Sequence, residues 1–383
     1  MGVQFSVEDL KQAARNETGL DDFGDPWFEV PLAALVKALN EEADLSEMGG
    51  YIQGASLTKY LGERLRKVQL FKDHPEIAAE EVGVLAEIVG LPRTGSTMLH
   101  RLLACSPHLT STFSWELLNP MPFPGEEPGD PTPRREAAAQ VAQIYLATMP
   151  EMASIHPIDP EGYEEDVLLL DRSFLSTGYT TMLKVPSYDR FLLDFDQTPA
   201  YRELKDWLKI LQWQAPERRG KRWILKSPHH LTALPALFAV FPECRVVMTH
   251  RTPVQTVPSY ASMAAALTKP NTDSLDPATL GPFWVKRFRR SLAEVIRLRE
   301  KDPSRFIDAR YEDVQRDPMG EAERVYGALG LPFGDLEVAA MKEWLVENAR
   351  DRHPAHRYTP EEFGLTREGL EQEFAFYTAE CLA

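Results

Sequence analysis

The chain has few cysteines and no long apolar run. Its 383 residues include only 3 cysteines, an odd number spread widely along the chain. This favours free thiols in a reducing cytoplasm over a disulfide framework. No stretch approaches the roughly 18 uncharged apolar residues of a transmembrane helix, and charged residues follow the N-terminus where a secretory segment would be apolar. The sequence therefore predicts a cytoplasmic protein without a membrane span.

Positive charge is scarce as well. The 42 Lys and Arg residues face 58 Asp and Glu residues, which gives a formal net charge of −16. Nucleic acids are bound mainly through Lys and Arg that neutralise phosphates, so we expect no nucleic-acid partner. An anionic ligand would have to meet a local basic cluster on this acidic chain.

The hydrophobic pattern changes near residue 82. Residues 1–82 show helical spacing, with a capping sequence at Ser6 and a third helix from about Ser56. Beyond them, short and almost uninterrupted apolar runs alternate with amphipathic helices, which is typical of a parallel sheet covered on both faces. The four predicted strands are 83–89, 222–225, 244–248 and 305–308. We therefore expect an N-terminal helical region, 1–82, packed on an α/β domain, 83–383.

A long insertion separates the first two predicted strands. It contains the Pro-rich stretch 119–133 and helical patterns at 134–149, 163–173 and 201–214. Segments of this length are often functional, although a plain surface excursion fits the pattern equally well.

The loop after the first predicted strand has the spacing of a phosphate-binding loop. Its sequence is Gly90-Leu91-Pro92-Arg93-Thr94-Gly95-Ser96-Thr97. A strand, a tight Gly loop and a helix N-terminus place unpaired N–H groups around an anion. Ser96 stands where a nucleoside triphosphatase has its Lys, so that activity is disfavoured, and Arg93 supplies positive charge instead. The alternative is a Gly-rich turn with no ligand.

The next two strand ends carry basic side chains. The second strand leads into Lys226-Ser227-Pro228-His229-His230, and the third leads into Arg251, with Ser259 about two helical turns further on. An Arg and a hydroxyl at this spacing suit one phosphate group. Two of these residues also have a plainer interpretation. Ser227 could be a helix N-cap, and Arg251 could be an ordinary ion-pair residue.

Taken together, these motifs resemble the sulfotransferases that use 3′-phosphoadenosine 5′-phosphosulfate (PAPS), and most closely their bacterial branch. The family's phosphosulfate loop is matched by 93–97, and its 3′-phosphate pair by Arg251 and Ser259. Further matches are Leu225 to Leu231, Trp115-Glu116-Leu117, Tyr311-Glu312-Asp313 with Asp317-Pro318, and His356-Arg357-Tyr358 with Phe363-Gly364-Leu365. The resemblance spans about 83–375 and implies a P-loop-like three-layer α/β fold with a central parallel sheet.

The resemblance also implies an activity. A sulfuryl group would pass from PAPS to a hydroxyl or amine of a small-molecule acceptor by in-line displacement, without a metal. Lys226 would stabilise the charge on the leaving oxygen, and residues 119–215 would form the acceptor side. The residues expected to bind PAPS are Arg93, Thr94, Gly95, Ser96, Thr97, Ser227, Arg251, Ser259, Tyr311 and Arg352.

The general base stays open at this point among His230, Glu116 and His229. His230 fits the family pattern best, and Glu116 comes second because some members place a carboxylate after the phosphosulfate loop. Each could instead form an ion pair, a cap or a packing contact. Arg352 is the nearest basic candidate for the family's C-terminal phosphate loop, of which the sequence has no literal copy.

Two other functions are compatible with the scaffold. A small-molecule kinase or other nucleotide-binding protein would need a loop Lys and magnesium-holding carboxylates, and the third strand ends instead in Thr-His-Arg. A non-catalytic binding protein would not need so many basic groups at successive strand ends. The identity of the acceptor and self-association into a homo-oligomer are left open by the sequence.

Overall fold

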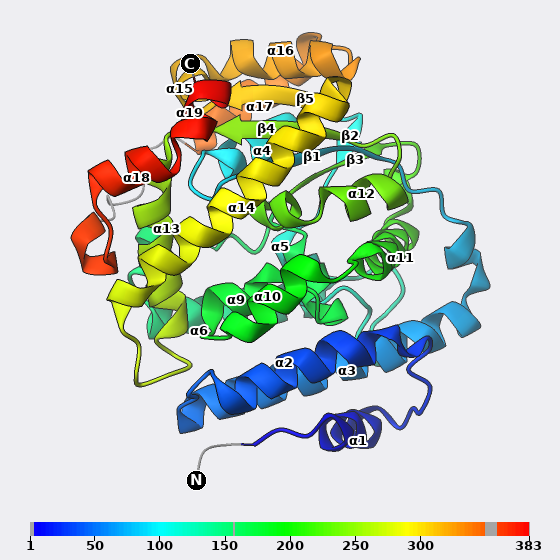
Figure 1. Ribbon diagram of the computed structural model, residues 1–383. Helices are drawn as coiled ribbons and strands as arrows, with labels where there is room; N and C mark the ends of the chain where they lie inside the picture. The colour runs from blue at the N-terminus through cyan, green and yellow to red at the C-terminus, as the bar shows by residue number, and fades with distance from the viewer. Residues whose placement is uncertain (1–3, 156–157, 349–357, 383) are drawn as a thin grey trace.

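The computed structural model describes residues 4–155, 158–348 and 358–382, and is built around a five-stranded parallel sheet (Figure 1). The strand order is β2-β3-β1-β4-β5, so β1 lies between β3 and β4. The strands are β1 (Val84–Gly90), β2 (Leu109–Thr110), β3 (Arg222–Lys226), β4 (Arg245–His250) and β5 (Phe306–Arg310). Every residue of β1 is buried, as expected of a central strand covered on both faces.

Helices cover both faces of the sheet. On one face, apolar side chains of the sheet pack against α4 (Ser96–Leu103), α16 (Pro318–Leu329) and α17 (Asp335–Glu347). On the other face they pack against α11 (Thr198–Gln214), α12 (Leu234–Val240) and α14 (Leu280–Lys301). The predicted three-layer α/β fold with a central parallel sheet is therefore confirmed.

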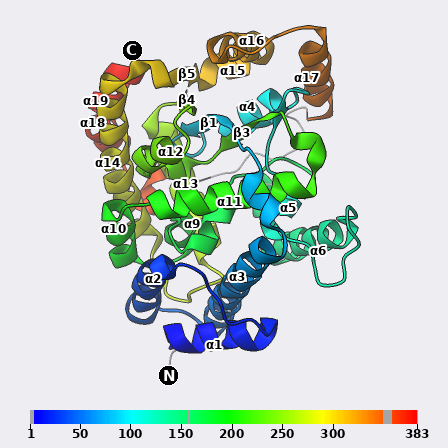
Figure 2. The same cartoon turned by 90° about the vertical axis from the view of Figure 1, so that its right-hand side faces the viewer.

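The insertion between β2 and β3 is mainly helical. Besides α11 it contains α5 (Ser114–Leu118), α6 (Thr132–Thr148), α7 (Met152–Ile155), α8 (Val167–Leu170), η3 (Asp171–Ser173), α9 (Thr177–Met182), α10 (Pro186–Asp194) and η4 (Pro216–Arg218). Figure 2 shows α6 standing out from the body of the molecule.

The remaining helices follow the strands. They are η5 (Pro228–Thr232), α13 (Pro253–Thr268), η6 (Pro277–Thr279), η7 (Pro303–Arg305), α15 (Tyr311–Arg316), η9 (Pro360–Phe363), α18 (Arg367–Glu373) and α19 (Ala375–Cys381). No helix among the described residues is long and apolar enough to span a membrane.

The N-terminal region is helical, as its spacing predicts, and packs against the insertion. It consists of α1 (Val7–Thr18), η1 (Pro26–Phe28), α2 (Glu29–Glu41), α3 (Glu47–Asp73) and η2 (Pro75–Ala79). Its apolar side chains belong to the same core cluster as those of α11. Buried Arg64 and Lys67 of α3 also form ion pairs with Glu203 of α11, at 2.6 and 3.1 Å. The division into 1–82 and 83–383 stays a prediction.

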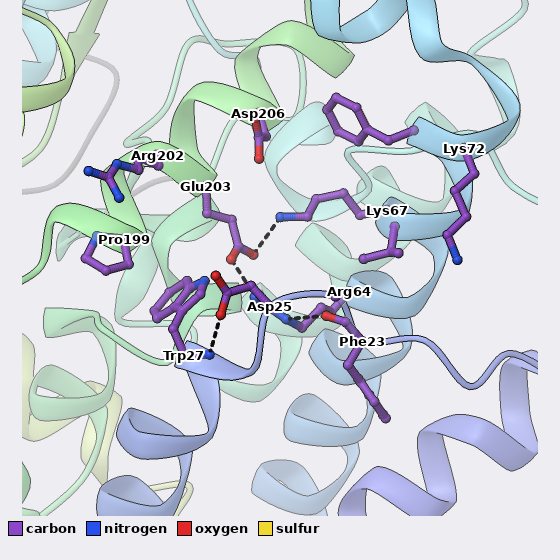
Figure 3. A pocket seen from close by; sticks show the side chains of 13 residues that line it. Phe23, Asp25, Trp27, Arg64, Lys67, Lys72, Pro199, Arg202, Glu203 and Asp206 are labelled. Atoms are coloured by element: carbon purple, nitrogen blue, oxygen red, sulfur yellow. Dashed lines mark hydrogen bonds and ion pairs between the residues drawn. The ribbon is translucent and has the colours of Figure 1, made fainter.

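A cavity of about 520 Å³ lies at this junction (Figure 3). Phe23 and Trp27 contribute to one side, and Arg202 and Asp206 of α11 to another. Among its charged groups, Arg64 and Lys67 pair with Glu203, as the dashed contacts show.

Several predicted boundaries were wrong. Strand β2 was missed, because a strand of two residues carries no periodic signal. Helix α3 begins at Glu47 rather than near Ser56, since glycines weaken the helical pattern there. Gly49 is nonetheless needed, because a Cβ would come within 2.0 Å of the Asn271 carbonyl oxygen. The helix predicted at 163–173 forms only from Val167.

Candidate active site

The loop between β1 and α4 is shaped as an anion cradle. Gly95 has a φ of 79° and precedes the first turn of α4, which no side chain caps. The first-turn N–H groups of Ser96 and Thr97 are therefore left for a ligand. Arg93 also lies in the left-handed region, with a φ of 70°; non-glycine residues adopt this conformation rarely and mainly at functional sites.

Close packing fixes the base of the loop. The Thr94 hydroxyl lies 2.6 Å from that of Thr249 in β4 and donates to the Leu91 carbonyl at 2.7 Å. A Cβ at Gly90 would come within 2.2 Å of the Thr249 hydroxyl oxygen. Thr94 therefore shapes the loop from beneath, with its side-chain oxygen already used.

The predicted basic residues of β1 and β4 meet at one place. The Arg93 Nε donates to the Ser259 hydroxyl at 3.3 Å, and the Arg251 Nη1 donates to the Arg93 carbonyl at 2.9 Å. Another nitrogen of Arg93 donates to the Ile155 carbonyl at 2.6 Å. The insertion thus reaches this cluster through α7.

Tyr311 joins the same cluster. The Arg251 guanidinium lies 4.0 Å from the centre of the Tyr311 ring. A Cβ at Gly95 would lie 3.0 Å from the Tyr311 ring, so glycine lets the loop approach that ring. Stacking on the Tyr311 ring and hydrogen bonds from Arg251 to the Arg93 carbonyl and the Gln255 side-chain oxygen hold Arg251 in place before any ligand binds.

Lys226 stands at the end of the neighbouring strand β3. It is fully buried, with its amine 2.6 Å from Glu165 and 3.2 Å from the Thr97 hydroxyl. The Ser227 hydroxyl donates to the other Glu165 oxygen at 3.3 Å. The Glu165 side chain keeps 23% of its surface exposed, whereas Lys226 has none.

His229 is held in one neutral form. Its Nδ1 accepts from the Thr177 N–H at 3.2 Å, and its Nε2 lies 3.1 Å from the side-chain oxygen Oε1 of Gln197. An N–H can only donate, so Nδ1 carries no proton and Nε2 carries the proton. Burial, helped by the nearby His230, lowers the pKa of His229 well below its usual value. This placement argues against proton transfer by His229.

His230 has no exposed surface and both ring nitrogens engaged. The Tyr201 hydroxyl lies 2.5 Å from Nδ1, while Asp166 and Glu87 lie 3.2 and 3.1 Å from Nε2. Burial alone would lower the pKa of His230, but Glu87, Tyr201 and Asp166 raise it well above its usual value. A buried, charged and paired imidazole is poorly placed to take a proton from an acceptor.

Glu116 has a local structural task. Its carboxylate accepts from the Phe113 N–H at 2.9 Å, which caps α5, and pairs with the buried Arg218 at 2.8 Å. Both side chains are almost fully buried. Of the two interpretations that the sequence allowed for Glu116, the geometry favours the ion pair.

The sequence did not reveal Glu165 and Asp166 at the end of β3, nor the role of the buried Glu87 within β1. The only signal was an acidic run just before an apolar helix, which resembles a solvated helix start. Arg352 and the 356–357 part of the tail motif lie outside the described residues.

The arrangement defines a class of protein. Arg93, Lys226 and Arg251 follow three adjacent parallel strands, β1, β3 and β4, at their carboxyl ends, where α/β proteins bind ligands. A loop with free N–H groups and flanking cations suits a phosphorylated nucleotide. The missing loop Lys and the basic end of β4 separate it from a nucleoside triphosphate kinase.

The chain belongs to the sulfotransferase family, whose model matches residues 87–335. It is an enzyme of sulfuryl transfer. The omega-hydroxy-beta-dihydromenaquinone-9 sulfotransferase Stf3 of Mycobacterium bovis is 30% identical over 293 residues, which span 73% of this chain and 71% of the relative.

Two solved sulfotransferases share the whole architecture. STF1 from Mycobacterium tuberculosis has a TM-score of 0.85 at 30% identity, covering 97% of this chain and 99% of that chain. STF9 from Mycobacterium avium has a TM-score of 0.87 at 28% identity, covering 98% and 96%. The kinase alternative is therefore set aside.

Proposed function

We propose that the sulfuryl donor is PAPS and that the acceptor is a hydroxyl or amine of a small molecule. The observation that carries this proposal is the meeting of Arg93, Lys226 and Arg251 at adjacent strand ends of a chain with a net charge of −16. A compact positive site on an acidic protein suits one small polyanion rather than a nucleic-acid strand.

Two groups of residues would hold the donor. The free N–H groups at the start of α4 and the Arg93 guanidinium suit the 5′-phosphosulfate. Arg251 and Ser259 suit the 3′-phosphate, since both side chains contact Arg93 and so lie close together. The stacked guanidinium of Arg251 offers its remaining N–H groups in a fixed orientation.

We assign the general base to Glu165. PAPS supplies a sulfuryl group on a good leaving group, so the protein has to position the reactants and move one proton. Glu165 takes that proton from the acceptor as the acceptor oxygen or nitrogen bonds to sulfur. The bond from sulfur to the phosphate oxygen breaks, and that oxygen leaves with the electron pair beside Lys226. Glu165 contacts Lys226 directly and is partly exposed, whereas His230, His229 and Glu116 are buried and occupied.

The acceptor class follows in part from the relatives. Stf3 is named for a hydroxylated menaquinone, which supports a hydroxyl acceptor here, and the insertion would provide its binding surface. The cytoplasm is the proposed location, because the three cysteines are free.

Ligand-dependent thermal stability tests the donor assignment. Adenosine 3′,5′-bisphosphate at about 100 times its Kd should stabilise the protein by about 2.7 kcal/mol. ATP with magnesium at the same concentration should stabilise it much less. Stabilisation by ATP with magnesium but not by the bisphosphate would rule out the proposed donor.

A further inference from the structure

An acidic segment of the insertion, 164–166, crosses the end of β3. The side chains of its last two residues, Glu165 and Asp166, each contact a basic side chain at or just after the end of β3. Glu165 lies 2.6 Å from Lys226, and Asp166 lies 3.2 Å from His230. Neighbouring Cα atoms are only about 3.8 Å apart, so a shift of the backbone at Asp166 is transmitted to Glu165.

The second contact belongs to a fully buried group of four side chains. This His230 cluster consists of His230 of η5, Glu87 of β1, Asp166 at the start of α8 and Tyr201 of α11. We propose that the His230 cluster positions Glu165 against Lys226, and so sets the rate of turnover without touching the substrates. This inference rests on the proposed role of Glu165.

The cluster joins the elements that carry the reaction. Glu87 lies in β1, the strand that leads into the phosphosulfate loop. His230 follows Lys226 through Ser227 and Pro228, a short stretch in which Pro restricts the backbone. Tyr201 comes from α11, the last α-helix of the insertion before β3. The cluster therefore ties the strand ends and the insertion to one point.

The charge of the cluster is nearly balanced, which suits a permanent buried contact. Burial and the adjacent Asp166 raise the pKa of Glu87 to about 8, so Glu87 is mostly protonated at neutral pH. The imidazolium of His230 then faces the Asp166 carboxylate as its main counter-charge. The other titratable groups facing it are Tyr201, His229 and the buried thiol of Cys244, whose pKa is also raised by burial.

Both carboxyl oxygens of Glu87 and the Oδ2 of Asp166 are buried without a hydrogen-bond partner. Ligating atoms of Glu87, Asp166 and His230 lie within 4.8 Å of one another. A divalent cation would satisfy the same group, so metal content must be part of the test. Stoichiometric metal in the purified protein that is lost in Asp166→Asn would overturn the proposal.

The decisive variant is Asp166→Asn, with Asp171→Asn as its matched control. Both replace a buried carboxylate of the insertion by an amide of the same size, and Asp171 faces Ser176 rather than the strand ends. A misplacement of about 1 Å can lower a rate by about 10²-fold. We expect a loss of that size in the kcat of Asp166→Asn, with its affinity for adenosine 3′,5′-bisphosphate within twofold of wild type. Asp171→Asn should keep the wild-type kcat.

A second pair of variants covers the case in which Asp166→Asn does not fold. Tyr201→Phe and Tyr188→Phe each remove one buried hydroxyl. That of Tyr188 bonds to backbone groups, donating to the Phe174 and Ser176 carbonyls and accepting from the Ser176 N–H. Tyr201→Phe should lower kcat with unchanged bisphosphate affinity, and Tyr188→Phe should not. Equal kcat in the two variants, or a parallel loss of kcat and bisphosphate affinity in Tyr201→Phe, would contradict the proposal.

Glu165→Gln, assayed in parallel, separates the two levels of inference. Loss of turnover in Glu165→Gln with full turnover in Asp166→Asn overturns the positioning role alone. Full turnover in Glu165→Gln overturns the assignment of the base and the positioning role with it.

Nitrogen-15 NMR of the histidine rings gives an independent readout. In wild type, the His230 ring should carry a proton on both nitrogens at pH 7. In Asp166→Asn, the ring should lose one of these two protons at a lower pH than in wild type. A neutral His230 ring at pH 7 in wild type would contradict the proposed charge balance.

Discussion

Replacing Arg251 by Ala should weaken binding of adenosine 3′,5′-bisphosphate and leave binding of adenosine 5′-monophosphate unchanged. The two ligands differ in the 3′-phosphate, which is the group assigned to Arg251. The structure holds this guanidinium in advance by a 2.9 Å hydrogen bond to the Arg93 carbonyl and by the ring of Tyr311. Little conformational entropy is therefore lost when the phosphate arrives.

The expected size of the effect follows from that geometry. A hydrogen bond between charged groups contributes about 1.5–3 kcal/mol, which corresponds to roughly 10- to 150-fold in Kd. Arg251→Lys keeps the charge but loses both the fork of N–H groups and the stacking on Tyr311, so its Kd should lie between those of wild type and Arg251→Ala.

Isothermal titration calorimetry with both nucleotides measures the effect. The ratio of the two affinities should fall by at least tenfold in Arg251→Ala, while the unfolding temperature without ligand stays close to that of wild type. An equal loss for both nucleotides would mean that Arg251 acts through the loop carbonyl of Arg93. No loss for either would remove Arg251 from the site.

Three further outcomes follow from the same geometry. Lys226→Ala should keep the fold and lower kcat by about 10²-fold or more, as expected for loss of a charge beside the leaving oxygen; wild-type initial rates would contradict its role. Gly95→Ala should cost about 1–2 kcal/mol because of its left-handed φ, and the new Cβ would press on Tyr311, so calorimetry should show weaker bisphosphate binding. The pKa of Glu87 is raised to about 8 by burial, above its ordinary value, so the folded protein retains a proton that the unfolded chain releases. The contribution of Glu87 to wild-type stability should therefore fall as the pH rises from about 4.5 to 8, by at most about 1.4 kcal/mol per unit. Denaturant unfolding of Glu87→Gln should show a flatter dependence, and an unchanged slope would contradict the raised pKa.

The central strands of the sheet could be predicted from the sequence, because each has a clear pattern of apolar residues. A strand covered on both faces must be an apolar run, so the predicted strand at 83–89 lies within one residue of β1. The edge strand β2 has only two residues and left no such signal. Helix α3 was shortened in the prediction because glycines such as Gly49 are poor helix formers, whereas Gly49 allows close contact with Asn271 in the structure.

Some residues of the candidate site could likewise be predicted from the sequence, and others could not. Arg93, Lys226 and Arg251 could be placed together, because parallel strands bring their carboxyl ends to one edge of the sheet. Glu165 and Asp166 could not, since they come from an insertion whose path over the sheet has no local sequence signature. The burial of His230 and Glu116 was equally hidden, because a polar residue at a strand end carries no mark of whether its partners are protein groups or substrate.

The most direct test of the assigned activity is transfer from PAPS labelled in its sulfuryl group to a panel of hydroxyl and amine acceptors. We expect label to appear in an acceptor of the wild-type protein, with one equivalent of adenosine 3′,5′-bisphosphate released for each sulfuryl group transferred. Glu165→Gln should bind the donor and transfer little. Turnover that uses ATP with magnesium and leaves PAPS intact would contradict the assignment.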